Sequence, residues 1–560
     1  EVVVTEKKRQ TTGTQQLDVK DMKQTPSSTG NAVEDMIQQQ AGVSTHNELS
    51  SQYNVRGGSF NENSVYINNV EMYRPMLVNS GQQEGLSVIN ADMVESVAFS
   101  TGGFEARYGD KMSSALDIKY RQPKKNEARL EASLLGASAY AAVKTKKLTM
   151  SHGLRYKTNR NLLGSLDTQG EYKPNFLDYQ TYITYTPNER WKIDLIGDIS
   201  ENHYNFIPSS RETSFGTMED VKSFRVYFDG QEKDVFRTLF GTVGIERKFT
   251  DRTSMKLLFS AFHSKEKETY DIQGQYWLDD TQSSENLGVG TYHEHARNYL
   301  TSNMQSVKLM ANHKWGRHQS EAGVTVKWED IKENSREYEM RDSSGYNIPH
   351  SPDRLDLIYS LISRNKLSSN RVEGYIQDTY RWASGSEGGT HYTLNYGLRM
   401  SHWSYNRETI VSPRLSLAII PAHCQDMTLR FATGLYYQTP FYKELRDTVT
   451  LNGRTVVELN PKVKSQQSLQ FIAAMDYRFK MNDRPFKFTA EAYYKNLHNL
   501  IPYNVQNLKI TYDASKQCDG YAMGLDLKLY GEFVPGTDSW LTLSVMKTQQ
   551  TINGIKTPLP

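Results

Sequence analysis

Long segments in which apolar and polar residues alternate dominate the chain from about residue 127 onward. In the segment 191–199, Lys192, Asp194 and Asp198 stand between apolar residues and a glycine. The same alternation recurs in the segments 427–435, 486–495, 523–529 and 541–545. Because successive side chains of a strand point to opposite faces, each segment has one apolar face and one polar face. Such strands, about 10–15 residues long, fit a wall with lipid on its outside and water on its inside.

A soluble β-sandwich is the alternative that this periodicity leaves open, although sandwich strands are usually only about 5–6 residues long. Membrane-spanning helices are excluded, because the 560-residue chain has no run of about 20 apolar residues. The formal net charge of +2 gives no reason to expect a nucleic-acid partner. No catalytic arrangement stands out among the 64 acidic residues and 13 histidines, so we expect no enzymatic activity.

Neither the cysteines nor the clustered histidines are expected to form a special site. Cys424 and Cys518 match no metal-binding or redox spacing. Cys424 falls in an expected inner turn and Cys518 in an expected outer loop, so the two are too far apart to form a disulfide. His293 and His295 would share one face of a strand, but the sequence offers no third ligand. We therefore expect no metal site and no cofactor.

Residues 17–124 follow a different pattern, typical of a small α/β domain. A helix is expected over 32–40, with Asn31 as its N-cap and Gly42 at its end. Asn68-Asn69 is a turn pair that tolerates positive φ. One further helical turn is expected at 90–95. Strands are expected at 52–56, 64–67, 70–73, 97–100 and 115–120.

The connections between the long segments are alternately short and long, as in membrane barrels with short inner turns and long outer loops. Short turns are expected near 188–190, 251–252, 316–317, 422–426, 481–484 and 534–538. Long polar loops are expected at 159–177, 207–234, 271–297, 337–370, 440–466 and 501–519, and the brief connection near 406–409 is an exception. The short connections are flanked by tryptophans, as an aromatic girdle would be, although core positions would fit as well: Trp191, Trp315, Trp382 and Trp540.

The chain contains about 17 such strands, if 128–144 is two strands bent near Gly136. Barrels that hold a plug in their lumen have 22 strands. An open edge in lipid leaves backbone groups unsatisfied, so we expect further strands to follow residue 560. The sequence also starts without a signal peptide, although export is required, which indicates a processed or cropped product.

Several short motifs, taken in order, match a known family. In the first domain they are 31–43 (NAVEDMIQQQAGV), 54–58 (NVRGG), 64–70 (SVYINNV) and 94–97 followed by Arg107-Tyr108-Gly109. In the wall they are 412–415 (SPRL), 434–445 (GLYYQTPFYKEL), 458–473, 493–501 (YYKNLHNLI) and 520–525. From residue 1 to about 550 the chain resembles TonB-dependent outer-membrane receptors. It departs from them at Asn68-Asn69, which replaces Asp-Gly, and lacks their RGP tripeptide. Segment 108–117 (YGDKMSSALD) resembles receptors of the Bacteroidota.

This resemblance implies a transmembrane antiparallel β-barrel of the 22-stranded type, about 17 strands of it present, with an N-terminal α/β plug domain in the lumen. Residues 1–16 would be the Ton box and linker, 17–124 the plug domain and 125–560 the barrel, its C-terminal strands missing. The implied function is TonB-dependent active import of a scarce ligand across the outer membrane. The ligand would be an iron-siderophore, haem, cobalamin, an oligosaccharide or a peptide.

The implied partners are TonB with ExbB–ExbD, outer-membrane lipid and lipopolysaccharide, a small ligand from outside, and in some relatives a surface lipoprotein. The implied location is the outer membrane of a Gram-negative, Bacteroidota-like cell. A plug-and-barrel scaffold in a surface complex, without transport of its own, is the main rival. A barrel enzyme is disfavoured, because the plug would occupy the lumen.

The resemblance also places functional residues. The Ton box would be Glu1, Val2, Val3, Val4 and Thr5, whose three β-branched valines favour an extended strand for a partner's sheet edge, although a frayed terminus would look the same. Arg56 and Arg107 would pair with barrel carboxylates such as Glu131 or Glu491, or else remain solvated. Loops at 45–52 and 72–84 would contact the ligand, although the sequence fits equally well with apex loops that bind nothing. Their candidate contacts, with an aromatic wall from the barrel, are Tyr73, Arg74, Met76, Asn79, Gln82, Gln83, Tyr437 and Tyr442.

Overall fold

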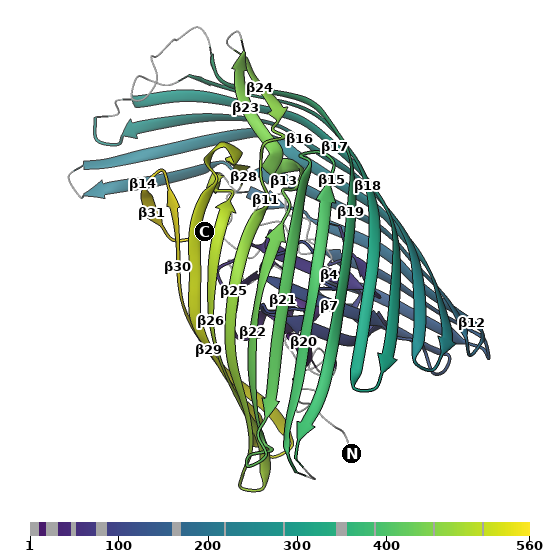
Figure 1. Ribbon diagram of the computed structural model, residues 1–560. Helices are drawn as coiled ribbons and strands as arrows, with labels where there is room; N and C mark the ends of the chain where they lie inside the picture. Colours follow the sequence, from purple (N-terminus) through teal and green to yellow (C-terminus); the bar gives the residue numbers. More distant parts are fainter. Residues whose placement is uncertain are drawn as a thin grey trace.

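The computed structural model places a small sheet domain inside a large β-barrel (Figure 1). It describes residues 10–17, 19, 32–45, 52–73, 87–158, 170–217, 220–283, 286–342, 355–385, 388–451, 454–506 and 509–559. The expected plug and barrel are therefore both present. Within the described residues, no helix is long and apolar enough to cross a membrane.

The plug domain contains a five-stranded sheet in the order β1-β6-β7-β4-β5. Its strands are β1 (Gln15–Leu17), β4 (Asn63–Ile67), β5 (Val70–Glu71), β6 (Val94–Ser100) and β7 (Ser114–Tyr120). The other elements are α2 (Ala32–Gln38), η2 (Phe60–Glu62), η3 (Ala91–Met93) and the pair β2 (Val43–Ser44) and β3 (Asn54–Val55). The expected turn between β4 and β5 is confirmed, because Asn68 and Asn69 have φ of 48° and 73°.

The plug has an apolar core that continues into the barrel wall on one side. Val33, Ile37 and Leu116 are buried in it, and α2 contributes through its buried face. Inward-facing residues of the wall join the same cluster: Tyr182, Ile196, Phe240, Leu258, Phe262 and Met310. This side of the plug is therefore held by apolar packing.

Over the residues that the structure describes, the barrel contains 22 strand segments. Five are short extensions: β11 (Gly170–Tyr172), β14 (Arg211–Thr217), β23 (Arg446–Leu451), β24 (Arg454–Leu459) and β31 (Ile555–Thr557). The 22 segments less these five leave 17 strands, the expected number. They are β8 (Glu127–Ser133), β9 (Gly136–Lys144), β10 (Leu148–Thr158), β12 (Asn175–Asn188), β13 (Trp191–Pro208), β15 (Asp220–Thr250), β16 (Thr253–Asp280), β17 (Asn286–Trp315), β18 (His318–Asp342), β19 (Asp356–Ser384), β20 (Thr390–Trp403), β21 (Glu408–Ile420), β22 (Met427–Gln438), β25 (Gln466–Met481), β26 (Arg484–Leu500), β29 (Cys518–Val534) and β30 (Thr537–Ile552).

Several segments expected to be loops are strands, which corrects the sequence analysis. Strands β15 to β19 contain 25 to 31 residues each, so most of 207–234 and 271–297 belongs to the wall. These parts were misassigned because both faces of a strand can be polar once it rises beyond the lipid into water. Among the expected loops, 440–466 and 501–519 do carry irregular structure, including η4 (Tyr442–Leu445), η5 (Ala514–Lys516) and the hairpin β27 (Tyr503–Gln506) and β28 (Lys509–Tyr512).

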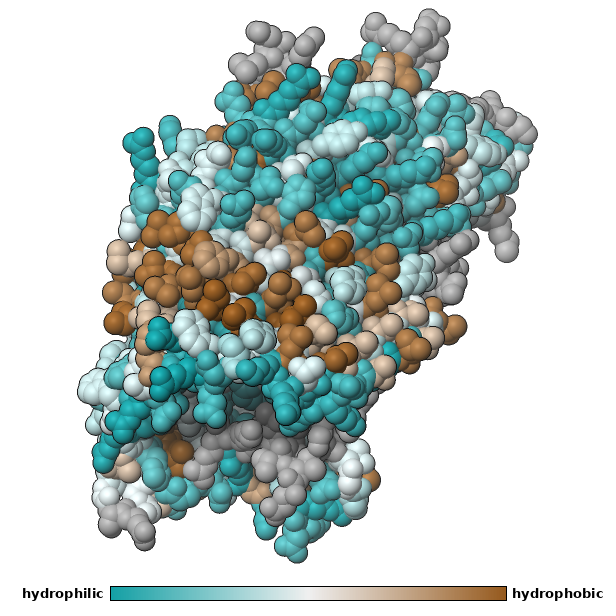
Figure 2. All heavy atoms as spheres, turned by 90° about the vertical axis from the view of Figure 1, so that its right-hand side faces the viewer, coloured by the Kyte–Doolittle hydropathy of each residue, from teal (hydrophilic) through white to brown (hydrophobic). Residues whose placement is uncertain are grey.

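The two faces of the wall differ as the alternation predicted. On β13, Asp194 and Asp198 are buried toward the lumen, whereas Ile199 on the opposite face is 57% exposed. Figure 2 shows apolar residues gathered into a belt across the middle of one face of the barrel, with hydrophilic surface above and below. This belt matches the hydrocarbon layer of a membrane.

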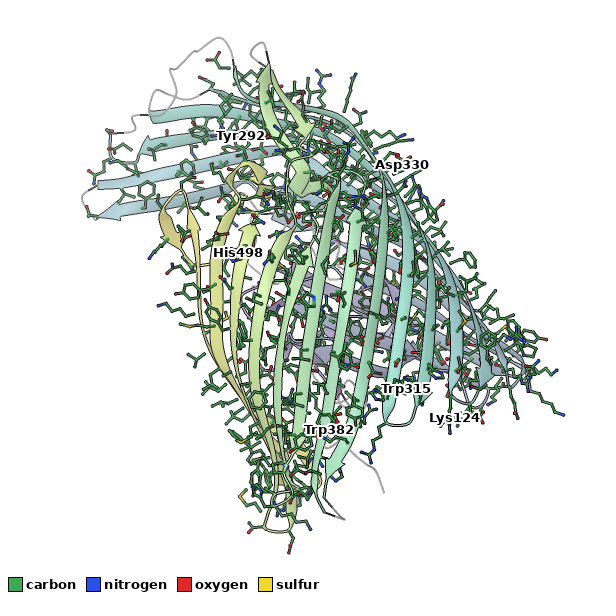
Figure 3. All side chains as sticks on the ribbon, viewed as in Figure 1. Lys124, Tyr292, Trp315, Asp330, Trp382 and His498 are labelled. Atoms are coloured by element: carbon green, nitrogen blue, oxygen red, sulfur yellow. The ribbon has the colours of Figure 1, made fainter. Side chains whose placement is uncertain are left out.

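Stacked aromatic rings lie near the short turns at the inner end of the barrel. Trp315 stacks on His318 at 4.1 Å, and His318 stacks on Tyr380 at 4.4 Å. Trp382 continues the stack between Tyr380 and Tyr392. Figure 3 shows Trp315 and Trp382 at this lower end, close to the turns. The long connections therefore define the opposite, outer end.

Candidate functional site

An open cavity lies between the plug and the outer half of the barrel. The plug contributes the β4–β5 hairpin and the segment around Asp110 to its lining. The barrel contributes inward-facing residues of β15 to β20. Connections at the outer end add further lining residues, namely Thr439, Pro440, Phe441, Lys443 and Tyr512. The cavity is therefore placed where a ligand from outside would meet the plug.

The lining of this outer cavity carries more positive than negative formal charge. Its acidic side chains are Glu71, Asp110, Glu329 and Glu373. Its basic side chains are Arg107, Lys111, Lys308, Lys327, Arg371, Arg399 and Lys443. Seven cations against four anions leave an excess of +3. Low-dielectric walls focus the electric field of such a charge excess into the cavity, so the cavity attracts anions.

Five of these charged residues form a network that ties the plug to the barrel across the floor of the cavity. Lys327 of β18 lies 2.8 Å from Glu71 of the plug and 2.7 Å from Glu373 of β19. Arg399 of β20 lies 2.6 Å from Glu373 and 3.3 Å from Asp110 of the plug. Each plug carboxylate is thus held by a barrel cation, and Glu373 holds both cations in place.

The outer cavity also has aromatic walls. Tyr73 packs edge-on against Phe262 with ring centroids 5.1 Å apart. The Lys308 ammonium lies 5.8 Å from the centre of the Tyr66 ring. At the outer rim, Phe441 packs edge-on against Tyr512 at 5.1 Å. Aromatic faces next to cations can hold a planar, negatively charged ligand through stacking and ion pairing.

The two barrel tyrosines expected in the aromatic wall do not line this cavity. Tyr442 is buried and donates a hydrogen bond to Glu333 at 2.7 Å. Tyr437 is half-buried and is not among the lining residues. Their neighbour Phe441 does line the cavity, because it lies in the connection that leads into η4.

Arg56 sits at the inner side of the plug, in contact with two barrel strands. Its guanidinium lies 2.6 Å from Glu491 of β26 and 2.9 Å from Asp526 of β29. The Tyr493 ring covers it at 4.3 Å. Its side chain is only 2% exposed, so the two carboxylates are what balances its charge. Glu491 is the barrel partner that the sequence analysis named for a plug arginine.

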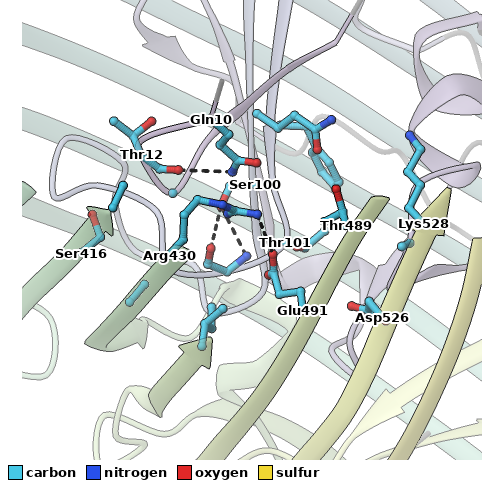
Figure 4. A pocket seen from close by; sticks show the side chains of 18 of the residues that line it. Gln10, Thr12, Ser100, Thr101, Ser416, Arg430, Thr489, Glu491, Asp526 and Lys528 are labelled. Carbon is cyan, nitrogen blue, oxygen red and sulfur yellow. Dashed lines mark hydrogen bonds and ion pairs between the residues drawn. The ribbon is translucent and has the colours of Figure 1, made fainter. Parts of the chain in front are cut away.

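The Arg56 ion pairs border a second cavity, which is also open to solvent. Figure 4 shows Gln10 and Thr12 on one side of it, with Glu491 and Asp526 on barrel strands on another. The segment 10–15 that lines this inner cavity leads directly into β1. Thr14 in that segment donates a hydrogen bond to Glu105 at 2.6 Å.

Arg107 and Glu131 do not form the contact that the sequence analysis considered. Arg107 lies over the Tyr108 ring at 4.6 Å, and its backbone N–H donates to Gln377 of β19. Glu131 is exposed on β8, where its nearest cation is Arg129 at 3.8 Å. Glu131 shares its face of β8 with Arg129, and it is Arg129 that reaches the plug, through Asp92 at 2.7 Å.

Further expected site residues lie outside the described part of the chain. These are the Ton box Glu1, Val2, Val3, Val4 and Thr5, and the loop residues Arg74, Met76, Asn79, Gln82 and Gln83. Of that loop, Tyr73 is described, and it lines the outer cavity.

The barrel cations of the outer cavity were not identified from the sequence. Lys308, Lys327, Arg371 and Arg399 are charged residues at inward positions of long strands, which was a usable signal. Their meeting with Glu71 and Asp110 depends on strand register and on the orientation of the plug. Neither quantity can be read from one sequence.

The plug carries a buried carboxyl group, Glu34, next to the segment that begins at Ser87. Ser87 donates a hydrogen bond to Glu34, and Arg155 of β10 holds the carbonyl oxygens of Ser87 and Ile89 at 2.7 and 2.8 Å. Burial raises the pKa of Glu34 to about 7, although the Ser87 hydrogen bond opposes this shift. Glu34 is therefore expected to exchange its proton near neutral pH.

Two family models match the chain. The model described as "TonB dependent receptor-like, beta-barrel" matches residues 194–554, and the model described as "TonB-dependent Receptor Plug Domain" matches residues 6–115. No curated protein matches.

Solved structures share the fold at low sequence identity. The copper transporter OprC has a TM-score of 0.62 at 13% identity, over 97% of this chain and 80% of that one. The outer membrane transporter YddB from Escherichia coli has a TM-score of 0.61 at 11% identity, over 96% and 77%. The ferric enterobactin receptor PfeA from Pseudomonas aeruginosa has a TM-score of 0.59 at 13% identity, over 99% and 81%. Identities this low establish the fold alone.

Proposed function

Since the chain belongs to the TonB-dependent receptors of the Gram-negative outer membrane, we propose that it actively imports a small ligand through its barrel. The observation that carries this proposal is a barrel filled by its own plug beneath an outward-facing cavity. A filled barrel is not a pore, so passage requires the plug to rearrange. The outer cavity is where a ligand would bind before the plug rearranges.

The contacts between plug and barrel support a plug that can be moved. On one side they are ion pairs and hydrogen bonds, such as Lys327–Glu71, Arg399–Asp110 and Arg56–Glu491. Polar groups separated by movement can be satisfied by water entering between them, which limits the cost of separation. The apolar cluster on the other side resists movement, so energy must be supplied. TonB with ExbB–ExbD would supply it by pulling on Glu1–Thr5.

We propose a small, negatively charged ligand with a planar part, such as a ferric chelate. The charge excess of the outer cavity and its aromatic walls support this class. Two of the structural relatives are named a copper transporter and a ferric enterobactin receptor. The loop residues Arg74, Met76, Asn79, Gln82 and Gln83 directly follow or lie near Tyr73 in the sequence, so we expect them to reach the same ligand. A Bacteroidota-like origin and a surface lipoprotein partner belong to this proposal as well.

The proposed role of Glu1–Thr5 as the segment that TonB binds and pulls can be tested with two matched substitutions. V3P removes a backbone donor and prevents the segment from adding as a strand, whereas V3I keeps a β-branched side chain. We expect V3P to abolish uptake of a radiolabelled ferric chelate while surface binding stays within about twofold. V3I should behave as wild type.

Loss of both uptake and binding in V3P would refute the handle role, because the segment would then support the binding site itself. Unchanged uptake in V3P would refute TonB-coupled transport through this segment. It would favour the rival function, a scaffold in a surface complex.

A further inference from the structure

Acidic residues cover the lumen side of the barrel wall above the outer cavity. The lining of that cavity reaches Phe262 of β16 and Met304 of β17, and both strands continue outward from there. Figure 1 shows this outer part of β15 to β18 rising above the plug and leaning across the open end of the barrel. Its inward positions have the parity of the buried residues Asp234, Ala296 and Ile331. They are the even-numbered residues of 232–238, 264–272 and 294–302 and the odd-numbered residues of 331–339, and we call the surface that they form the acidic face.

The acidic face holds eight carboxylates and neither lysine nor arginine. Two arginines reach it from outside these positions: Arg446 lies 3.5 Å from Glu333, and Arg341 pairs with Glu339. Eight carboxylates against two arginines give a formal charge of −6. The six carboxylates beyond these two pairs are Glu232, Asp234, Glu266, Glu268, Glu294 and Glu337. The charge is opposite in sign to that of the outer cavity below.

The strand register sets carboxylates of the acidic face directly opposite one another. Asp234 of β15 is the cross-strand partner of Glu268 of β16, and Glu294 of β17 is the partner of Glu339 of β18. Like charges in such positions destabilise a sheet. Burial raises the pKa of the Tyr270 hydroxyl on the same face, and four carboxylates raise it further: Glu337, Glu294, Glu232 and Glu268. A bound cation would relieve this repulsion.

Two buried hydroxyl groups lie at the lower border of the acidic face. Ser264 and Ser302 are cross-strand partners, 2% and 1% exposed. Neither hydroxyl has a hydrogen-bond partner in the part of the chain that the structure describes. A buried polar group left unsatisfied costs about 1–3 kcal/mol. A hydroxyl oxygen can accept a hydrogen bond from an ammonium or guanidinium group, and Glu266, two residues from Ser264, disfavours an anion there.

Aromatic rings accompany the carboxylates. Tyr292 packs edge-on against Phe228 with ring centroids 6.2 Å apart, and Figure 3 shows Tyr292 high on this part of the wall. Tyr359 is 39% exposed and donates a hydrogen bond to Glu337 at 3.3 Å. Aromatic rings attract organic cations. Over the described residues, no group of three or more His, Cys, Asp or Glu side chains could hold a metal ion, so the arrangement suits an organic cation better than a bare metal ion.

We propose that the acidic face binds an extended, positively charged arm of the imported ligand. This inference rests on the proposed import function and adds a second charged part to a ligand whose anionic part enters the outer cavity. Phe262, which lines the cavity, and Glu268 are six residues apart on β16, which is about 20 Å along the strand. An extended peptide of about six residues spans that length. The two charged regions together select a ligand with opposite charges at its two ends.

The test uses the full chain purified in detergent and three probes: an anionic ferric chelate, the same chelate carrying a hexalysine arm, and the hexalysine peptide alone. The variants E232Q/E268Q and E294Q/E337Q each remove two carboxylates from the acidic face. The control E189Q/D251N removes two carboxylates from exposed turns at the inner end of the barrel. We expect calorimetry to show that the arm raises the affinity of wild type for the chelate about tenfold. Each acidic-face variant should lose most of this gain, and the control should keep it.

Three further measurements separate the arm from the rest of the ligand. The chelate without an arm should bind wild type and all variants equally, because the outer cavity is unchanged. Hexalysine alone should bind wild type at low ionic strength and bind either acidic-face variant about tenfold more weakly. The variant E294D/E337D keeps both charges and should keep the gain, which separates charge from packing.

Equal affinity of wild type for the two chelates would overturn the proposal. A gain that persists in both E232Q/E268Q and E294Q/E337Q would overturn it too. The proposed import function would survive either result, because it is tested by uptake in V3P. Hexalysine binding that both variants weaken would support the acidic face even if the chelate without an arm did not bind, and that second result would count against the proposed ligand class alone.

Discussion

Replacing Arg56 by methionine tests how strongly the ion pairs seat the plug. The substitution keeps much of the side-chain volume but leaves Glu491 and Asp526 without the cation that lies 2.6 and 2.9 Å from them. Both carboxylates are largely buried, with 13% and 3% of their side chains exposed. Removing one partner of a buried ion pair typically costs about 3–5 kcal/mol, because an uncompensated charge remains. Glu491 still has Arg430 at 3.4 Å, so Asp526 should account for most of the cost.

The companion variants separate this charge effect from lost packing. D526N alone should cost only about 1 kcal/mol, because Arg56 keeps Glu491 and the buried site loses a charge rather than gaining one. In the double variant R56M/D526N the uncompensated carboxylate is gone, so at least half of the R56M cost should be recovered. A double-mutant cycle measures this coupling directly.

Hydrogen exchange of residues 52–73 in the detergent-solubilised protein is the suitable assay, because it reports opening of the plug while the barrel stays folded. R56M should accelerate exchange there by at least a hundredfold, the equivalent of about 3 kcal/mol. An R56M effect below tenfold would refute the reasoning. So would equal exchange in R56M and R56M/D526N, because the cost would then come from lost packing.

Two further predictions concern pH and ligand charge. The pKa of Glu34 is about 7 in the folded plug against an ordinary value of 4.5, so the wild-type plug loses stability as pH rises from 4.5 to 7. The variant E34Q should therefore stabilise the plug by up to about 3 kcal/mol at pH 8 and have no effect near pH 4. Hydrogen exchange measured at the two pH values would show this difference. Reversing one charge at the rim of the outer cavity with K443E should weaken binding of an anionic ferric chelate about tenfold, whereas K443R should not, and calorimetry that found equal affinities would exclude an anionic ligand.

The sequence was sufficient to predict the barrel strands, but not how far the strands extend beyond the membrane. Period-two alternation in segments such as 191–199 follows from contact with lipid on one side and water on the other, so it predicted the strands and their number. It failed at 271–297, where β16 and β17 continue above the membrane and apolar residues are no longer required on one face. The plug was predicted well where local chemistry decides, as at Asn68-Asn69.

The contacts of the site were only partly predictable. Arg56 had two candidate carboxylates in the sequence analysis, Glu131 and Glu491, and the strand positions decide between them, because Glu491 is the one that lies 2.6 Å from Arg56. Lys327 could not be linked to Glu71, because 256 residues separate them and the link depends on how the plug is rotated in the barrel. Tyr442 was expected to face ligand, but it turns toward Glu333, a strand residue whose position the sequence does not give.

The order of strands in the plug sheet has a mechanical consequence. Strand β1 lies at the edge of the sheet and is the first strand of the described residues. Within those residues, three pairs join it to β6: Gln15↔Phe99, Gln16↔Ala98 and Leu17↔Val97. Any load applied to the amino-terminal end reaches this short seam before the rest of the sheet. The β1–β6 pairing can therefore separate while β4, β6 and β7 stay folded. Separation of β1 would then relieve the load before it reaches the rest of the plug sheet.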